Sequence, residues 1–243
     1  MIVIDNLFKR HGKQEVLRGV SLSVGRGEVA VVVGPSGGGK STLLRCINGL
    51  ERFDAGRIVV GSDELTAGAI PSQTLQRVRT RTGMVFQAFH LFPHLSTLEN
   101  VLAGPLYGQG KSRDEVEPEA RRLLQRVGMA HKADARPEVL SGGEQQRVAI
   151  ARALAVCPEA ILFDEPTSAL DPVMAGEVQE VIAGLARDGL TMIVVTHALQ
   201  FARKVAMTVH VMHQGQLAES GPPEQIFDSP RSEAVKVFLR QAT

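Results

Sequence analysis

The sequence predicts an α/β fold built on a parallel β-sheet whose two faces are both covered. Three short apolar runs, residues 29–33, 160–163 and 192–195, each pass directly into polar residues. Continuous apolar runs of this length are typical of strands that are buried on both faces of a parallel sheet. Because such sheets bind ligands at the carboxyl ends of their strands, we expect the three polar clusters at one edge.

Length and composition favour one domain with subdomains. The 243 residues are enough for a substantial core. A formal net charge of +1 indicates no basic surface for nucleic acid. No apolar run approaches the roughly 20 residues that span a bilayer, and the first five residues read as a strand rather than a signal peptide. Cys46 and Cys157 are far apart in the sequence, so reduced thiols packed on helices are expected.

The other segments divide into a β part and a helical part. Residues 16–24 and 57–60 read as antiparallel strands. From residue 88 to residue 140 the apolar spacing becomes helical, which indicates a helical insertion. Because Pro118 would interrupt a helix that begins at Ser112, the main helix of this insertion is expected to start near Pro118.

A phosphate-binding loop follows the first apolar run. Eight residues fit the pattern G-x-x-x-x-G-K-[ST], and Thr42 follows them: Gly34, Pro35, Ser36, Gly37, Gly38, Gly39, Lys40 and Ser41. A strand precedes the loop and an apolar helix follows it, as the pattern requires. Such glycines let backbone N–H groups surround phosphates, while Lys40 reaches the terminal phosphates and Ser41 offers its hydroxyl to Mg²⁺.

Polar residues at the other strand ends are candidates for catalysis. Asp164 and Glu165 follow the second run, where the first carboxylate would hold Mg²⁺ and the second would accept a proton from water. Adjacent acids at a strand end are also often merely solvated. His197 follows the third run, and Gln87 follows the strand-like residues 83–86. In isolation, the glutamine would indicate no function, and the histidine would more often be structural than catalytic.

A second anion site is indicated by the octapeptide that runs from Leu140 to Arg147, Leu-Ser-Gly-Gly-Glu-Gln-Gln-Arg. It opens a helix expected from Glu144 to about residue 154, with Ser141 as its cap. Two glycines, Gly142 and Gly143, leave the N–H groups of the helix start open to an anion. Ser141 and Glu144 also fit a capping box, which explains these two residues but not the glycines.

Together, these motifs resemble the ABC ATPases over residues 5–217. The resemblance implies a P-loop NTPase fold that binds ATP with Mg²⁺ and hydrolyses it. Its RecA-like parallel core would comprise residues 1–87 and 155–243, together with an antiparallel β subdomain. Residues 88–154 would form the helical subdomain that carries the octapeptide, all within a single domain of residues 1–243.

The same resemblance assigns roles to individual residues. Glu165 is the catalytic carboxylate, and His197 contacts the terminal phosphate. Gln87 touches the metal and the attacking water, and Asp164 holds the metal. Residues 166–171, which end at Asp171, resemble a loop that crosses a dimer interface. His11 stands where the family usually has an aromatic residue on adenine, and with Val16 it is expected to contact the base.

Two copies are expected to pack head to tail as a homodimer. Each ATP would then lie between residues 34–42 of one chain and residues 141–143 of the other. In a single chain, Ser141, Gly142 and Gly143 would therefore face solvent.

Residues 83–101, 45–48 and 221–227 look like those of importers of polar amino acids. This implies a peripheral location at the cytoplasmic face of the membrane and a transmembrane permease as partner. The permease would contact Phe89, Leu91 and Phe92, and an extracytoplasmic solute-binding protein would act indirectly. The alternatives are a soluble ABC ATPase that acts on DNA, a small-molecule kinase with a P-loop, or a family member that serves another solute.

Overall fold

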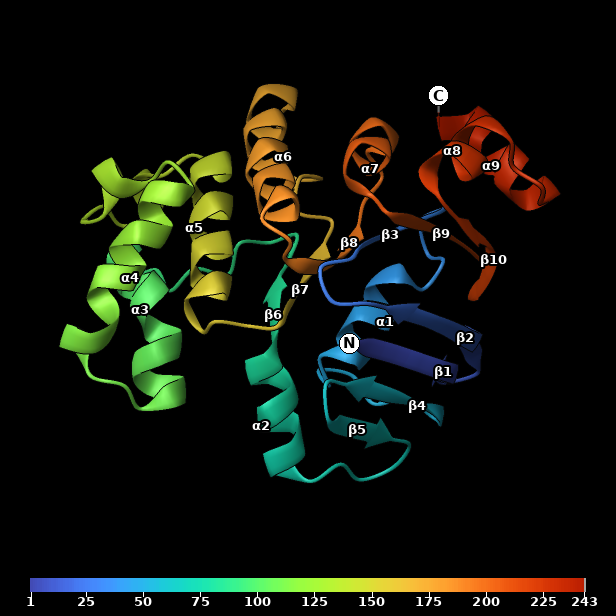
Figure 1. The fold of residues 1–243 in the computed structure, drawn as a ribbon, viewed down its shortest axis with the longest axis horizontal. Helices are drawn as coiled ribbons and strands as arrows, with labels where there is room; N and C mark the ends of the chain where they lie inside the picture. Colours follow the sequence, from blue (N-terminus) through green and yellow to red (C-terminus); the bar gives the residue numbers. More distant parts are fainter. Residues whose placement is uncertain (243) are drawn as a thin grey trace.

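Two β-sheets, one of six strands and one of four, organise the fold in the computed structural model, which describes residues 1–242 (Figure 1). The six-stranded sheet has the order β10-β9-β3-β8-β7-β6. Its strands are β3 (Val29–Val33), β6 (Thr82–Val85), β7 (Ala160–Asp164), β8 (Thr191–Val195), β9 (Thr208–His213) and β10 (Gln216–Gly221). All neighbours pair in parallel except β9 and β10, which are antiparallel.

The three apolar runs form the adjacent strands β3, β8 and β7, which confirms the predicted parallel sheet. Successive residues of these strands face two different cores. Val31 and Phe163 belong to the core beneath the outer helices, whereas Val32 and Leu162 belong to the core shared with the smaller sheet. The side chains of β3, β7 and β8 are buried throughout, which explains why the sequence shows no polar alternation there.

The four-stranded sheet is antiparallel and has the order β2-β1-β4-β5. Its strands are β1 (Ile2–His11), β2 (Gln14–Val24), β4 (Ala55–Val60) and β5 (Asp63–Thr66). Helix α1 (Lys40–Ile47) lies between this sheet and the parallel sheet (Figure 1). Six of its eight residues are buried, and its apolar residues belong to the core shared by the two sheets.

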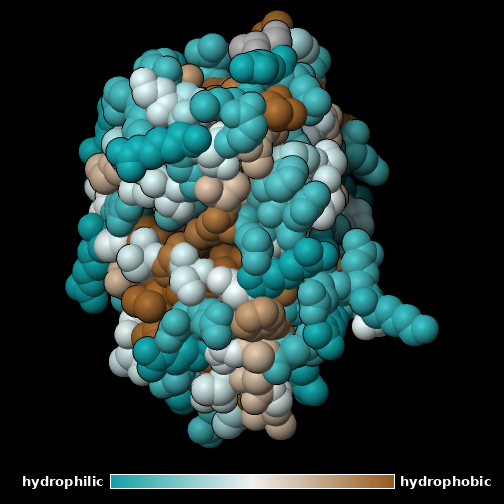
Figure 2. Space-filling view, turned by 90° about the vertical axis from the view of Figure 1, so that its right-hand side faces the viewer, coloured by the Kyte–Doolittle hydropathy of each residue, from teal (hydrophilic) through white to brown (hydrophobic). Residues whose placement is uncertain are grey.

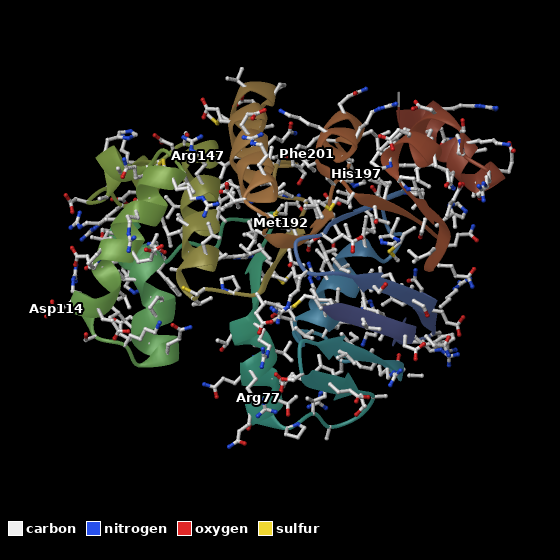
Figure 3. All side chains as sticks on the ribbon, viewed as in Figure 1. Arg77, Asp114, Arg147, Met192, His197 and Phe201 are labelled. Carbon is white, nitrogen blue, oxygen red and sulfur yellow. The ribbon has the colours of Figure 1, made fainter. Side chains whose placement is uncertain are left out.

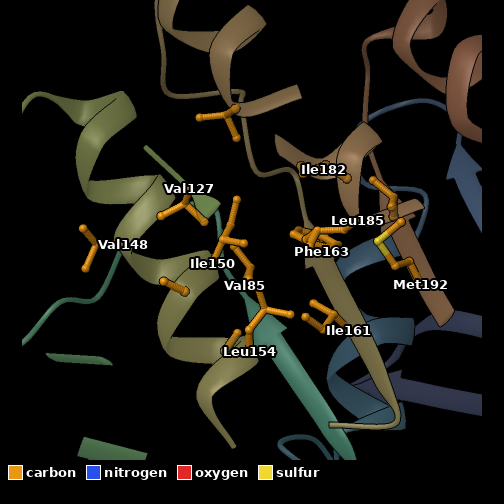
Figure 4. Close-up of a cluster of buried hydrophobic side chains, with 14 of the residues drawn as sticks. Val85, Val127, Val148, Ile150, Leu154, Ile161, Phe163, Ile182, Leu185 and Met192 are labelled. Carbon is orange, nitrogen blue, oxygen red and sulfur yellow. The ribbon is translucent and has the colours of Figure 1, made fainter. Parts of the chain in front are cut away.

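Helices cover the other face of the parallel sheet, and a separate group of helices follows β6. The helices are α2 (Ser72–Arg81), α3 (Thr97–Ala103), α4 (Arg113–Arg126), α5 (Gly142–Ala155), α6 (Pro172–Arg187), α7 (Leu199–Val205), α8 (Pro223–Asp228) and α9 (Glu233–Ala242). Short turns of π-helix, η1 (Gly104–Gly108), and 3₁₀ helix, η2 (Ala130–Lys132) and η3 (Pro137–Val139), link the helices of this group. Figure 4 shows Ile150 and Leu154 of α5 packed with Val85 and Phe163 of the sheet.

Helix α4 begins at Arg113, so the expected start near Pro118 is wrong. Pro118 lies inside the helix, where it removes the N–H group that would bond to the carbonyl of Asp114. Both residues are exposed, so water can reach the freed carbonyl. The burial of Val116 and Ala120 on the opposite side holds this first turn in the helix.

Two other boundaries differ from the sequence expectation. Helix α5 begins at Gly142 rather than at Glu144, and β1 extends to His11 because it pairs along its whole length with β2. The division at residues 87/88 and 154/155 stays a prediction, and residue 243 of the expected domain lies outside the described residues. Cys46 lies in α1, whereas Cys157 is exposed and follows α5 in a left-handed conformation, so only one thiol is packed on a helix.

None of the helices formed by residues 1–242 combines the length and apolar character needed to cross a membrane. The face that carries α8, α9, β10 and the antiparallel sheet is mostly hydrophilic, with an apolar region near its middle (Figure 2).

A buried histidine makes the stability of this fold sensitive to acid. His210 of β9 is 5% exposed, and its Nδ1 lies 2.8 Å from Ser220 Oγ. Its Nε2 has no hydrogen-bond partner in the described part of the chain. Burial lowers the pKa of His210, and the nearby charge of Glu28 opposes this shift. Folding therefore favours the neutral imidazole.

We expect the free energy of unfolding to fall as the pH falls below about 6.5, the ordinary pKa of histidine, because the unfolded chain then binds a proton that folded His210 does not. The slope from this group is at most about 1.4 kcal/mol per pH unit. Urea unfolding at pH 7.5 and pH 5.5 measures the change. His210→Gln should reduce it, whereas the same substitution at the exposed His131 should not. Equal pH dependence in both variants would contradict the assignment.

Candidate functional site

A cavity of about 340 Å³ lies where the phosphate-binding loop meets the ends of β7 and β8. Most of the predicted ATP-site residues line it, together with Gln14: His11, Val16, Ser36, Gly37, Gly38, Gly39, Lys40, Ser41, Thr42, Glu165 and His197. Residues that follow three different strands thus meet at one edge of the parallel sheet. This is where the sequence placed them.

The loop is shaped by glycines that allow close backbone approach. Gly34 has φ 142°, and a Cβ atom there would lie 2.1 Å from the carbonyl oxygen of Met212. Gly39 has φ 93°, and a Cβ atom there would lie 2.7 Å from the carbonyl oxygen of Val16. Both the conformation and the space therefore require glycine at these two positions. Because Gly39 provides no side-chain cap, the N–H groups that begin α1 are available to an anion.

Lys40 is the cation of this loop and is only 4% exposed. Its Nζ donates to the carbonyl oxygens of Gly34, at 2.8 Å, and Pro35, at 2.9 Å. Burial lowers the pKa of Lys40, while the charges of Glu165 and Asp164 oppose that shift. A buried ammonium beside uncapped backbone N–H groups fits the phosphates of a nucleoside triphosphate.

Ser41 and Asp164 form a pair of oxygen ligands suited to Mg²⁺. Ser41 Oγ donates to Asp164 Oδ1 at 2.6 Å. Burial raises the pKa of Asp164, whereas the Ser41 hydrogen bond and Arg45, 3.8 Å away, lower it. The described residues contain no group of three or more His, Cys, Asp or Glu side chains that could hold a metal ion. Mg²⁺ generally takes few carboxylates and keeps waters and phosphate oxygens, so the pair fits this ion.

Gln87 lies in a neighbouring cavity of about 310 Å³, which Ser41 and Asp164 also line. Ser41 is therefore the residue that the two cavities share. The structure thus brings the three predicted metal residues together, although Gln87 does not line the cavity of the phosphate-binding loop.

Glu165 and His197 form a hydrogen-bonded pair. The distance between His197 Nε2 and Glu165 Oε1 is 2.8 Å. Glu165 has a left-handed backbone with φ 49°, which is uncommon for a residue other than glycine. Its N–H donates to the carbonyl of Val195 at 3.0 Å, and its carbonyl accepts from Ser168 Oγ at 3.0 Å. These bonds hold the turn after β7 so that the carboxylate meets the histidine that follows β8.

The octapeptide, residues 140–147, lies outside both of these cavities. Ser141 caps α5 in a capping box: Glu144 N–H donates to Ser141 Oγ at 3.3 Å, and Ser141 N–H donates to Glu144 Oε2 at 2.8 Å. Neither of the two cavities is lined by Ser141, Gly142 or Gly143. In Figure 3, Arg147 of the octapeptide and His197 of the site lie on opposite sides of α6.

The glycines of the octapeptide also have a packing role that the sequence analysis missed. A Cβ atom at Gly142 would lie 2.9 Å from Leu170 Cδ2, and one at Gly143 would lie 3.0 Å from Met174 Cβ. Gly143 is buried, so the expectation that it faces solvent is wrong, while Ser141 and Gly142 are half-buried. The reason is the close approach of α5 to α6 and the segment before it.

Asp171 is exposed and outside both cavities. Its carboxylate accepts from the N–H groups of Val173, at 3.0 Å, and Met174, at 3.1 Å, and thereby caps α6. Within one chain this residue therefore has a structural role.

The contacts that several residues make around the site were not predicted from the sequence. Arg45 lies one helical turn after Ser41 in α1, and this spacing was the available signal. The loop after Gln87 is held by α5: Gln146 Nε2 donates to the carbonyl of Phe86 at 3.1 Å. Arg152 donates to the carbonyls of Phe89, at 3.0 Å, and His90, at 2.6 Å. No short-range sequence pattern indicates these contacts.

Comparisons with known proteins agree with this geometry. Residues 17–168 match the ABC transporter family. The arginine/ornithine transport ATP-binding protein AotP of Pseudomonas aeruginosa is 49% identical, with 97% of this chain and 96% of the relative covered. The histidine transport ATP-binding protein HisP of the same organism is 50% identical over 97% of this chain and 96% of the relative. The glutamine transport ATP-binding protein GlnQ of Escherichia coli is 47% identical over the whole of both chains.

Solved structures extend the comparison to the fold. The ATP-binding cassette MJ0796, in a dimeric post-hydrolysis state bound to ADP and Pi, matches with a TM-score of 0.81 at 33% identity. It covers 92% of this chain and 99% of its own. The chain therefore belongs to the ABC transporter family and is an ABC-type ATPase. This confirms the predicted P-loop NTPase fold, while the roles of individual residues stay predictions.

Proposed function

We propose that this ATPase is the energy-supplying subunit of a membrane importer for polar amino acids, working at the cytoplasmic face of the membrane. The main support for ATP hydrolysis at this site is the cavity in which the phosphate-binding loop faces the Glu165–His197 pair. The assignment to amino acids is supported by relatives at 47–50% identity that are named for the transport of arginine/ornithine, histidine and glutamine.

Lys40 and the start of α1 bind the phosphates of ATP in this proposal. Lys40 exchanges the carbonyls of Gly34 and Pro35 for phosphate oxygens, so its positive charge is already at the site before binding. The glycine-rich backbone of the loop supplies further N–H donors. Ser41, Asp164 and Gln87 would hold Mg²⁺, which would neutralise part of the negative charge of the phosphates.

Glu165 accepts the proton of the attacking water. Its carboxylate lies at the cavity wall, 2.8 Å from His197 Nε2, and is half-buried. His197 holds this carboxylate in place and contacts the terminal phosphate. Because no other carboxylate lines this cavity in the described residues, Glu165 is the base that the geometry favours.

A second copy of the chain completes the site. Ser141, Gly142, Gly143 and Asp171 lie outside the cavity in one chain. The related cassette MJ0796 is dimeric in its ADP- and Pi-bound state. In a head-to-tail homodimer, the octapeptide of one chain faces the phosphates held by the other. ATP binding then closes the dimer, and hydrolysis opens it.

A transmembrane permease docks on an apolar groove of about 730 Å³ between the parallel sheet and the helices that follow β6. Phe92 and Tyr107 line this groove and are 43% and 81% exposed. Of the three expected permease contacts, only Phe92 lines it, because Leu91 packs against the core and Phe89 lies against Gly142. An extracytoplasmic solute-binding protein delivers the amino acid to the permease.

Glu165→Gln should lower the rate of ATP hydrolysis by about 10²–10⁴-fold, because the amide cannot accept the proton of water. ATP binding should persist, and an ATP-bound dimer should accumulate. Phosphate release and size-exclusion chromatography with ATP measure the two effects. Glu64→Gln, at an exposed residue of β5, is the matched control. Hydrolysis by Glu165→Gln at the unmodified rate would show that another group is the base.

Ser141→Arg should abolish the ATP-dependent dimer while a single chain still binds ATP. The arginine would fill the space into which the partner's phosphates fit. Ser141→Ala separates this effect from the lost helix cap, which costs about 1 kcal/mol in both variants. Light scattering and nucleotide binding provide the measurements. Loss of ATP binding by the monomeric Ser141→Arg chain would contradict a site shared between two chains.

Phe92→Asp should abolish co-purification with the permease, because it places a charge in the apolar groove. Met207→Asp changes another exposed apolar residue, 58% exposed and outside the groove, and should retain the complex. Affinity purification from detergent-solubilised membranes, followed by uptake of radiolabelled arginine, histidine and glutamine in proteoliposomes, tests both partner and solute. A soluble ATPase without a permease is indicated if the unmodified chain retains no membrane protein.

A further inference from the structure

His11 lines the cavity of the phosphate-binding loop and is hydrogen-bonded to Glu51, a carboxylate outside that cavity. His11, at the end of β1, lines the cavity, and its side chain is 53% exposed. Its Nε2 forms a hydrogen bond with Glu51 Oε1. The Glu51 side chain is only 19% exposed and is not among the cavity residues. The Glu51 carboxylate therefore contacts a cavity residue through His11.

Glu51 is itself fixed in place. Its backbone N–H donates to the carbonyl of Arg45 at 3.1 Å, at the C-terminal end of α1. Lys9 Nζ lies 3.5 Å from the same Oε1 atom that His11 contacts. The backbone of Glu51 is thus held by α1, and its carboxylate is held by Lys9 of β1. The acceptor that meets His11 has little freedom to move.

This contact limits what the imidazole can do. A carboxylate accepts but does not donate, so the Nε2 atom of His11 carries a proton. The hydrogen bond also removes rotation of the ring, which costs conformational entropy before any ligand binds. An imidazole offers less area to a base than a phenol or phenyl ring. Fixing the ring in advance offsets part of this loss, because less ordering is left for the binding step.

We propose that Glu51 is a positioning residue for the nucleotide base: it orients His11 so that the imidazole stacks on the purine of ATP. This inference rests on the proposed ATP site. Helix α1 then sets both halves of the nucleotide, because its N-terminal end holds the phosphates and its C-terminal end holds Glu51. A change at Glu51 acts on the base and not on the phosphates.

The test compares Mg·ATP with inorganic triphosphate, which has no base, on the full-length chain. Glu51→Ala should weaken ATP binding about threefold to tenfold, the range for one aromatic contact. Triphosphate binding should not change, and in hydrolysis assays the effect should lie in KM rather than kcat. Glu51→Gln should restore most of the affinity, because its amide oxygen still accepts from Nε2–H. Isothermal titration calorimetry measures both ligands.

Two further variants separate positioning from a general structural role. In a His11→Phe background, Glu51→Ala should have no effect on ATP binding, because a phenyl ring cannot bond to the carboxylate. Glu64→Ala removes another carboxylate, the exposed one of β5, and should leave ATP affinity unchanged. If Glu51→Ala weakens ATP and triphosphate equally, or weakens ATP in the His11→Phe background, the inference is overturned. If the unmodified chain binds neither ligand, the proposed function fails as well.

Discussion

The close backbone packing of the phosphate-binding loop is the constraint on which the rest of the site depends. Gly34 lies against the carbonyl of Met212 in β9, and Gly39 lies against the carbonyl of Val16 in β2. The loop is therefore clamped between the two sheets, and any side chain at either position would lift it away. This clamp fixes the start of α1, and with it Lys40 and Ser41, opposite the ends of β7 and β8.

The buried charged residues at the carboxyl edge of the parallel sheet serve ligand binding at a cost in stability. Lys40 and Asp164 are each 4% exposed, yet no salt bridge joins them in the described residues. Burial disfavours the charged form of both, lowering the pKa of Lys40 and raising that of Asp164. Such groups are costly to bury without compensating partners. Here the compensation is partial. Carbonyl oxygens accept from Lys40, whereas Ser41 and the half-exposed Arg45 interact with Asp164. An anion that binds together with a metal ion would compensate both charges further.

The parts of the fold that local sequence determines were predictable, and those set by packing between distant segments were not. The strands β3, β7 and β8 can be recognised in the sequence because burial on both faces gives each of them an unbroken apolar run of at least four residues. The polar residues that follow these strands include most of the residues that line the cavity, because ligands of parallel sheets bind at the carboxyl ends of the strands. By contrast, Gly143 is buried by α6, and Pro118 is tolerated because Val116 packs on the other side. Both outcomes depend on neighbours far away in the chain. The Glu51–His11 contact joins residues 40 positions apart, so no sequence pattern marks it.

The same helix that carries the octapeptide also holds the loop that follows Gln87. Ser141 and its glycines begin α5, while Gln146 and Arg152 further along it bind the carbonyls of Phe86, Phe89 and His90. Arg152 also lies 5.6 Å from the centre of the Phe92 ring, which lines the apolar groove. A displacement of α5 therefore moves the octapeptide, the loop of Gln87 and one wall of the groove together. Because the contacts are to backbone carbonyls, they transmit this motion whatever side chains the loop carries. One helix thus links the surface proposed to meet a second chain to the groove proposed to meet a permease.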